Sequence, residues 1–511
     1  MLFNSLEFAI FLPIVFLIYW AIGYAHIKNR LKLRLQNAFI VIASYVFYGW
    51  WDWRFLLLIA FTSFCSWGSG LLIIKKREYG AEDFGGGQNV PFASKFWLTA
   101  NIVLNLFILG MFKYYDFFVR EFGNIFGVNT DSLLLRIILP VGISFYTFQA
   151  LGYSIDVYRK RIEPTRDIVA FFAYVAFFPQ LVAGPIERAT NLLPQFQQNR
   201  KFNYDQAVDG MRQILWGLFK KIVVADNCAT YVDQVWSTYD TQSGSTLLLA
   251  AILFTFQIYG DFSGYSDIAI GTSKLFGIKL MRNFNNPYFS RDIAEFWRRW
   301  HISLTTWFRD YVYIPLGGSR PNVVAGGMCS VETKKKLIIV RNTFVIFLLS
   351  GFWHGANWTY IAWGAYHAIL FLPLILLGRN RKYTNQIAEG RLLPTWKECG
   401  QMLITFIMVI IGCIIFRAES ITQAWDFVLN IGNQGIFNLP YCHGRMYMCT
   451  LMFGIVMMLF VEWINRDSEH GLALTKKHRL QWIRHIFYMF LILYIFYFGN
   501  FGYNQFIYFQ F

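Results

Sequence analysis

Long apolar runs alternate with short polar connections along almost the whole chain. A bilayer core about 30 Å thick needs roughly 20 apolar residues per helical crossing. By that measure the sequence predicts 12 membrane-spanning helices, with an uncertainty of one or two, at residues 8–25, 36–51, 54–74, 96–118, 132–157, 208–225, 245–277, 337–353, 355–377, 399–416, 447–465 and 482–508. The first run lacks a basic leader and a clear small-residue cleavage site, so we expect a retained helix and not a signal peptide.

Basic residues mark one side of this predicted bundle. Clusters follow the first, third and fifth predicted helices: Lys28, Arg30, Lys32 and Arg34; Lys75, Lys76 and Arg77; Arg159, Lys160, Arg161 and Arg166. Because cytoplasmic loops carry an excess of Lys and Arg, these three loops are expected inside and the N-terminus outside. The densest basic stretch, residues 279–341, is expected on the cytoplasmic side for the same reason.

Residues 167–187 break the alternation, since they are apolar yet have basic residues at both ends. A single crossing would place one basic cluster outside. A re-entrant hairpin that turns near Pro179 to Pro185 would keep both clusters inside, and such backbone needs surrounding protein or a water-filled cavity. A short apolar helix beneath the bundle explains the pattern equally well.

Composition supports a membrane protein. Hydrophobic residues make up 56% of the 511 residues and charged residues only 15%, against about 25% charged in soluble domains. This excludes a disordered chain and makes a water-soluble enzyme a poor fit. The net charge of +16 is interpreted as cytoplasmic-loop charge and lipid contact before nucleic-acid binding. We therefore expect one all-α polytopic membrane domain, residues 1–511, with about 11–12 transmembrane helices plus re-entrant or interfacial helices.

The stretch Glu295–Tyr311 combines aromatic and basic residues at helical spacing. It predicts one amphipathic helix with an aromatic face and an Arg-rich face, lying in the plane of the membrane interface. His301 falls at the edge of the aromatic arc. It is either a titratable group on the rim of a wet pocket or an interfacial histidine capped by a neighbour, and the helix alone favours the second interpretation.

The stretch Gly351–Trp358 places His354 between two apolar runs. An ionisable residue there is costly, so a functional role is the default hypothesis. Imidazole exchanges a proton near neutral pH. Asn357 would share its helical face if the helix continued. The alternative is a packing histidine in a seam between helices, and His367 fits that description better than His354.

Two acidic residues, Asp261 and Asp267, lie inside the predicted span 245–277. Bonding to another helix is favoured over catalysis, because six residues apart on a helix they need not share a face. Tyr259, Ser263 and Ser266 are the expected partners. The seven cysteines have no metal-ligand spacing, and no nucleotide or metal-hydrolase motif is found, so we expect no metal.

Two segments resemble the signature blocks of the membrane-bound O-acyltransferases: WRRWHISLTTWFRDYVYIPLGG (297–318) and FWHGANWTYIAWGAYH (352–367). Four further segments, 139–159, 177–188, 261–271 and 506–511, are similar to the bacterial alginate O-acetylase branch of that family. The teichoic-acid D-alanyl transferases are a more distant fit.

The resemblance implies a helical membrane fold around a buried reaction chamber, with helices 342–377 carrying the catalytic His354 and segment 279–341 its polar partner His301. It implies transfer of an acyl group, above all acetyl, from a cytoplasmic thioester to an exported polysaccharide. His354 would act as general base or carry the acetyl group briefly. His301 or Asn357 would orient it or stabilise the oxyanion. Trp353 is expected to contact substrate.

The donor expected from this resemblance is acetyl-CoA or an acyl-carrier thioester, with no bound cofactor. Arg298, Arg299 and Arg309 could attract CoA phosphates or an acidic carrier protein, although lipid-headgroup contact explains each arginine singly.

The predicted outer loops are too short to hold a glycan. The resemblance therefore points to a periplasmic acyltransferase partner and to a bacterial inner membrane. Alternatives are peptidoglycan O-acetylation, teichoic-acid D-alanylation, a transporter or flippase of a lipid-linked sugar, and a non-catalytic scaffold. The sequence shows no inverted repeats, which weakens the transporter alternative.

Overall fold

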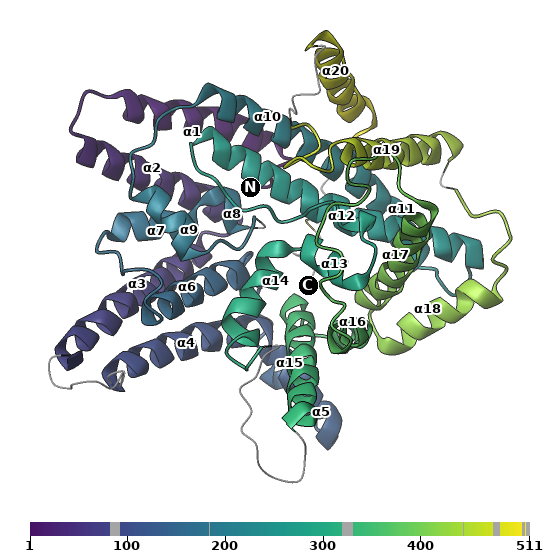
Figure 1. The fold of residues 1–511 in the computed structure, drawn as a ribbon, viewed down its shortest axis with the longest axis horizontal. Coiled ribbons are helices and arrows are strands. Elements are labelled where there is room, and N and C mark those ends of the chain that lie inside the picture. The colour runs from purple at the N-terminus through teal and green to yellow at the C-terminus, as the bar shows by residue number, and fades with distance from the viewer. Residues whose placement is uncertain are drawn as a thin grey trace. The chain divides into compact units, whose positions relative to one another are not determined.

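Helices account for every regular element in the part of the chain that is described. The structure, a computed structural model, describes residues 1–81, 92–182, 184–318, 331–442, 444–473, 481–502 and 506. Figure 1 shows the helices along the chain. They are α1 (Leu6–Tyr24), α2 (Asn29–Gly49), α3 (Arg54–Ala81), α4 (Phe92–Lys113), α5 (Tyr115–Phe126), α6 (Ile143–Tyr158), α7 (Ile168–Ala176), α8 (Phe178–Leu181), α9 (Ala189–Phe196), α10 (Tyr204–Leu218), α11 (Asp226–Trp236), α12 (Gly244–Leu275), α13 (Ile293–Arg299), α14 (Ile302–Phe308), α15 (Val331–His354), α16 (Trp358–Leu376), α17 (Trp396–Arg417), α18 (Ile421–Asn433), α19 (Arg445–Ile464) and α20 (Gln481–Phe498).

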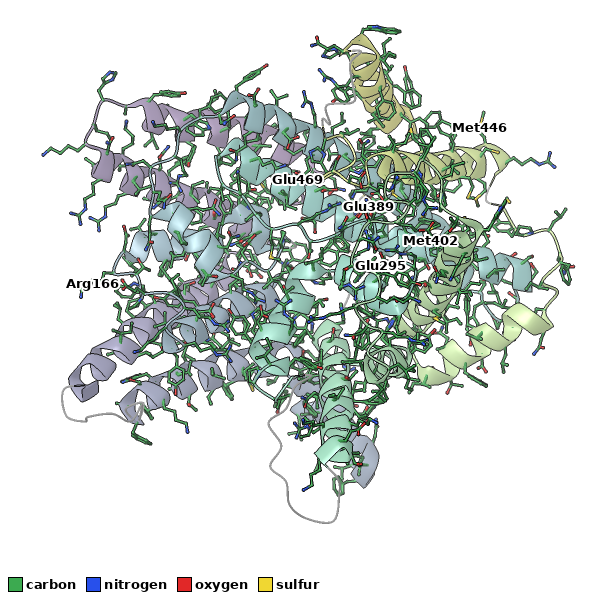
Figure 2. All side chains as sticks on the ribbon, in the orientation of Figure 1. Arg166, Glu295, Glu389, Met402, Met446 and Glu469 are labelled. Atoms are coloured by element: carbon green, nitrogen blue, oxygen red, sulfur yellow. The ribbon has the colours of Figure 1, made fainter. Side chains whose placement is uncertain are left out.

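The chain divides into two compact units. The first comprises Met1–Met211 with Ala269–Met281, and the second comprises Arg212–Ile268 with Arg282–Phe511. The division runs through α12. Both candidate histidines belong to the second unit. Glu295, labelled in Figure 2, belongs to the second unit and its side chain is buried. Arg166, also labelled there, belongs to the first unit and is exposed.

Nine helices in the described residues are long and apolar enough to cross a membrane: α1, the Arg54–Ile74 part of α3, α4, α12, α15 from Glu332, α16, α17, α19 and α20. Each corresponds to one of the predicted spans, so the prediction of a polytopic α-helical membrane protein is confirmed. These spans could be predicted from the local sequence because a run of about 20 apolar residues is typical of a transmembrane helix.

The other three predicted spans coincide with helices that do not meet this description. The span 36–51 lies in α2, whose first turns carry Arg30, Lys32 and Arg34. The span 132–157 becomes α6, whose 16 residues reach only about 24 Å. The span 208–225 becomes α10 followed by a π-helical segment, Phe219–Ala225, that contains two lysines. These three helices differ from the nine candidate spans in length or in apolar composition.

The apolar segment 167–187 forms two short helices, α7 and α8. The nine residues of α7 extend about 14 Å, so α7 is too short to cross a bilayer. Asp167 caps α7 by accepting hydrogen bonds from Val169 N and Ala170 N. The helical conformation is interrupted at Phe177, between α7 and α8. Phe178 N donates to Ser44 Oγ of α2 at 3.0 Å. Both short helices are buried in the first unit, as the two alternatives to a single crossing require.

The acidic residues of α12 are paired with lysines from the π-helical segment. Lys221 Nζ lies 2.7 Å from Asp261 Oδ1 and from Asp226 Oδ1. Lys220 Nζ lies 2.6 Å from Asp267 Oδ2 and 3.8 Å from Glu462 Oε1. The prediction that Asp261 and Asp267 bond across helices is confirmed. The expected partners are replaced by lysines, because Tyr259 donates to Glu462 and Ser266 accepts from Asn283.

Candidate functional site

His301 occupies a break between two helices. The sequence predicted one continuous helix over Glu295–Tyr311, and that prediction is wrong. Helix α13 ends at Arg299, and His301 adopts a left-handed conformation with φ 43° and ψ 55° before α14 begins. Backbone hydrogen bonds to a distant segment replace the helical ones: Ile302 N donates to the Asn283 carbonyl and Asn285 N to the Arg299 carbonyl, both at 2.9 Å.

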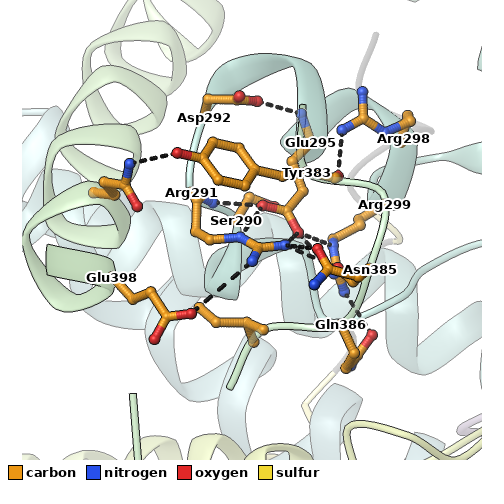
Figure 3. A network of polar contacts seen from close by, with 12 residues as sticks. Ser290, Arg291, Asp292, Glu295, Arg298, Arg299, Tyr383, Asn385, Gln386 and Glu398 are labelled. Carbon is orange, nitrogen blue, oxygen red and sulfur yellow. Dashed lines mark hydrogen bonds and ion pairs between the residues drawn. The ribbon is translucent and has the colours of Figure 1, made fainter. Parts of the chain in front are cut away.

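The aromatic side chains of the same segment are buried inside the protein. Trp297, Trp300 and Trp307 are each less than 9% exposed, and Arg299 is only 6% exposed. The buried arginine is tolerated because Glu295 binds it at 2.8 Å and also binds Arg291 at 3.0 Å (Figure 3). Attraction to a buried counter-ion offsets much of the free-energy cost of removing a charge from water.

Aromatic rings surround the His301 imidazole. Ring centroids of Phe262, Trp353 and Phe284 lie 4.6, 5.8 and 6.4 Å from it. Nδ1 lies 3.1 Å from Asn283 Oδ1, and Nε2 is buried without a hydrogen-bond partner in the described residues. Burial lowers the pKa of His301 to about 3. The ring is therefore neutral at physiological pH.

His354 is the last residue of α15 and is 5% exposed. Its ring centroid lies 4.9 Å from Trp353, 5.1 Å from Trp363 and 5.2 Å from Phe416. Trp353 thus contacts both candidate histidines. The two imidazoles that this indole contacts lie 53 positions apart in the chain.

Two glycines allow α15 and α16 to approach closely enough to build this arrangement. A Cβ added at Gly351 would lie 2.1 Å from the carbonyl oxygen of Tyr360, and one added at Gly364 would lie 2.3 Å from that of Phe347. Real Cβ atoms do not come so near to backbone. These two glycines therefore allow the helix that carries His354 to pack directly against α16.

Asn357 caps α16. Its Oδ1 accepts from Thr359 N at 3.1 Å, and its Nδ2 donates to the Glu419 carbonyl at 3.0 Å. The expected shared face with His354 is absent, because α15 ends at His354 and the chain turns before α16 begins. The structure gives Asn357 a role in shaping the turn that follows the histidine.

The three predicted donor-binding arginines have different surroundings. Arg298 donates to the carbonyls of Asn380 and Tyr383, the latter at 2.7 Å, and Arg299 is held by Glu295 (Figure 3). Arg309 is 57% exposed and pairs with the neighbouring Asp310. Two of the arginines thus hold segment 380–386 against α13, and the third faces an open space.

That space is a cavity of about 210 Å³. Arg309, Arg381 and Asn380 contribute polar groups to it. Aromatic and aliphatic side chains form most of the remaining lining: Trp297, Phe308, Phe347, Phe371, Ile346 and Ile375. Ser350 also lines it and lies four residues, about one helical turn, before His354 on α15. Residue 320, another arginine of the basic stretch, lies outside the described residues.

His367 packs as the sequence suggested. Its ring centroid is 4.9 Å from those of Trp297 and Trp363. Gly412 of α17 packs so closely that an added Cβ would lie 2.8 Å from His367 Nε2. This histidine belongs to a seam between helices.

Sequence reasoning missed Asn283, Ser303 and the segment around Tyr383. Asn283 precedes no periodic run and carries no motif, so no local signal marked it. The pairing of Arg291 and Arg299 with Glu295 could have been found, since both pairs have helical i, i+4 spacing.

Comparison with known proteins identifies the family independently of the structure. Residues 160–416 match the MBOAT, membrane-bound O-acyltransferase family. The "Probable alginate O-acetylase AlgI" of Pseudomonas aeruginosa is 40% identical over 90% of this chain and 80% of its own length. The "Peptidoglycan O-acetyltransferase" of Helicobacter pylori is 33% identical over 95% of this chain and 92% of its own. The "Teichoic acid D-alanyltransferase" of Bacillus subtilis is 29% identical over 55% of this chain and 69% of its own.

Proposed function

Because this chain belongs to the membrane-bound O-acyltransferase family, we propose that it moves acetyl groups onto hydroxyl groups of an exported polysaccharide. The chain is a multi-pass membrane acyltransferase. Its relatives named for alginate O-acetylation, at about 40% identity, favour a polysaccharide acceptor. The peptidoglycan relative covers as much of the chain at 33% identity and makes peptidoglycan the second candidate acceptor.

The observation that carries the proposal is the contact of Trp353 with both His301 and His354 inside a buried, aromatic environment. In the proposed reaction the acceptor hydroxyl gives its proton to His354 while its oxygen attacks the thioester carbonyl. The C–S bond then breaks, and the departing sulfur takes the proton to leave as a free thiol. General acid–base catalysis of this kind contributes about 10²–10⁴-fold. His301 orients the acceptor hydroxyl.

The proposed donor is acetyl-CoA, with an acyl-carrier thioester as the alternative. The cavity beside α15 supports this choice, because it combines apolar walls with two arginines, Arg309 and Arg381. Arginine suits phosphate or carboxylate groups, since its guanidinium binds them with two parallel hydrogen bonds. Arg298 and Arg299 serve this site indirectly by holding α13 and segment 380–386 in place.

We further propose that residues 1–511 act as one catalytic domain in a bacterial inner membrane, with the basic stretch 279–341 on the cytoplasmic side. A periplasmic acyltransferase partner would complete the transfer to the glycan. Loss of glycan acetylation without loss of thioester turnover, when a secreted partner is deleted, supports this division of labour.

The function is tested with purified protein in lipid nanodiscs. We expect consumption of acetyl-CoA in the presence of polysaccharide acceptor, and a loss of at least about 100-fold in kcat for His354→Gln. His470→Gln is a matched control, because His470 is equally buried but lies outside the site. Full turnover by His354→Gln at normal protein level contradicts the proposed site. Absence of thioester turnover in the wild type contradicts the proposed acetyl-transfer activity.

A further inference from the structure

Asn283 is a fully buried residue whose side-chain amide lies within hydrogen-bond distance of His301. Its Nδ2 donates to Ser266 Oγ at 3.1 Å. Three groups surround its Oδ1: the backbone N of Ser303 at 3.3 Å, Ser303 Oγ at 2.9 Å and His301 Nδ1 at 3.1 Å. Its main-chain carbonyl accepts from Ile302 N at 2.9 Å. The amide is thus held on both sides.

The orientation of this amide follows from chemistry. A backbone N–H can only donate, so the Asn283 atom that faces Ser303 N must be the oxygen. An amide oxygen only accepts, so His301 Nδ1 must carry a hydrogen that it donates to Oδ1. The reverse assignment would place an imidazole lone pair 3.1 Å from a carbonyl oxygen, which is repulsive. Ser303 Oγ also lies 3.4 Å from Nδ1, but its shorter contact is with Oδ1.

We propose that Asn283 is a positioning residue that locks His301 in the Nδ1–H tautomer and leaves Nε2 as a hydrogen-bond acceptor. The neutral state of the ring agrees with this, since burial lowers the pKa of His301 to about 3. An Nε2 lone pair cannot stabilise an oxyanion. His301 therefore accepts a hydrogen bond from the acceptor hydroxyl and orients it, a role that rests on the proposed function, whereas the tautomer does not.

The backbone around His301 is built to hold this geometry. The left-handed conformation at φ 43° is uncommon for a residue other than glycine. Hydrogen bonds from Ile302 N and Ser303 N to Asn283 fix the backbone immediately after the histidine. One residue thus secures both the strained backbone and the ring, which suits a site where orientation matters.

Charged groups on the neighbouring elements are engaged elsewhere. Asp261 of α12 is bound to Lys221, and Arg299 of α13 is bound to Glu295. On α15 the Trp353 ring contacts both His301 and His354. In the ranges that the structure describes, Asn283 Oδ1 and Ser303 Oγ are the recorded hydrogen-bond partners of Nδ1.

The tautomer is measured by ¹⁵N NMR of the full-length protein in nanodiscs with ring-labelled histidine. His301 is assigned by the signal lost in His301→Gln. We expect a protonated Nδ1 and an unprotonated Nε2 between about pH 6 and pH 8. A protonated Nε2 in this range overturns the proposal. The predicted tautomer in a protein without acyltransferase activity supports this inference while refuting the proposed function.

Two substitutions separate positioning from simple destabilisation. Asn283→Asp keeps an acceptor oxygen, so we expect the Nδ1–H signal to persist and the pKa of His301 to rise towards its ordinary value. Asn283→Leu removes the acceptor, so we expect mixed tautomers and a fall of about tenfold or more in kcat, with KM for the donor changed less than about twofold. Asn465→Leu removes the partner of a different carbonyl, that of Gly471. It should leave the His301 spectrum unchanged. An unaltered tautomer in Asn283→Leu overturns the proposal.

Discussion

Trp353 contacts one imidazole on each of two chain segments, and this contact defines the chemistry at the scale of single residues. Because the His301 ring is buried among Phe262, Phe284 and Trp353, protonation is costly there. A neutral imidazole accepts a hydrogen bond, whereas an imidazolium does not. Burial thus keeps His301 usable across the physiological pH range.

His301 should also make the stability of the fold depend on pH. Its pKa is about 3 in the folded protein and near 6.5 in an unfolded chain. Between these values the unfolded state binds more protons, so this contribution to the free energy of unfolding is present above about pH 6.5 and falls as pH drops, by up to about 1.4 kcal/mol per pH unit. Thermal unfolding in detergent at pH 7 and pH 5 should therefore shift less for His301→Gln than for the wild type. Equal shifts would contradict the buried, neutral state.

At the scale of elements, close helix contacts and buried ion pairs place the site. The continuous helix predicted over Glu295–Tyr311 was wrong, because backbone hydrogen bonds to the Asn283 carbonyl and from Asn285 N compete with the helical ones. Such long-range competition leaves no periodic signal in the local sequence. The spans that were predicted well depend only on local apolar runs. The position of His354 was predictable from its motif, and the role of Asn283 was not.

Gly351 tests the helix contact that positions His354. We expect Gly351→Ala to push α15 away from α16 and to lower both thermal stability and acyl transfer, since the added Cβ would meet backbone at 2.1 Å. Gly400→Ala is the matched control, because nothing lies within 4 Å of the Cβ position there. That control should keep full activity and leave stability unchanged or raised by up to about 1 kcal/mol. Equal behaviour of the two variants would refute the positioning role of the contact.

Lys221 tests the ion pairs that tie the π-helical segment to α12. Lys221→Met leaves Asp226 and Asp261 buried without their shared cation, so we expect a loss of about 3–5 kcal/mol in unfolding free energy. Adding Asp261→Asn to Lys221→Met should restore part of the lost unfolding free energy. Lys336→Met removes an exposed pair with Glu332 and should change stability by less than about 1 kcal/mol. Denaturant titration in detergent compares these three variants. A small effect for Lys221→Met would contradict the stabilising role of the Lys221 ion pairs.

At the scale of the whole molecule, nine candidate spans in the described residues make this a multi-pass membrane protein, and its family makes it an acyltransferase. The family could be recognised from two sequence blocks because both coincide with the histidine-bearing segments, 297–318 and 352–367. The cavity beside α15 could not be recognised, since its lining comes from four separate parts of the chain.

The most direct test of the central claim measures the acetyl content of the exported polysaccharide in cells that carry the wild type, His354→Gln or His470→Gln as their only copy. With equal amounts of each protein in the membrane, we expect full acetylation with the wild type and with His470→Gln. We expect a loss of at least about 100-fold in the acetylation rate with His354→Gln. Normal acetylation by His354→Gln would contradict the assignment of acyl transfer to the imidazoles around Trp353.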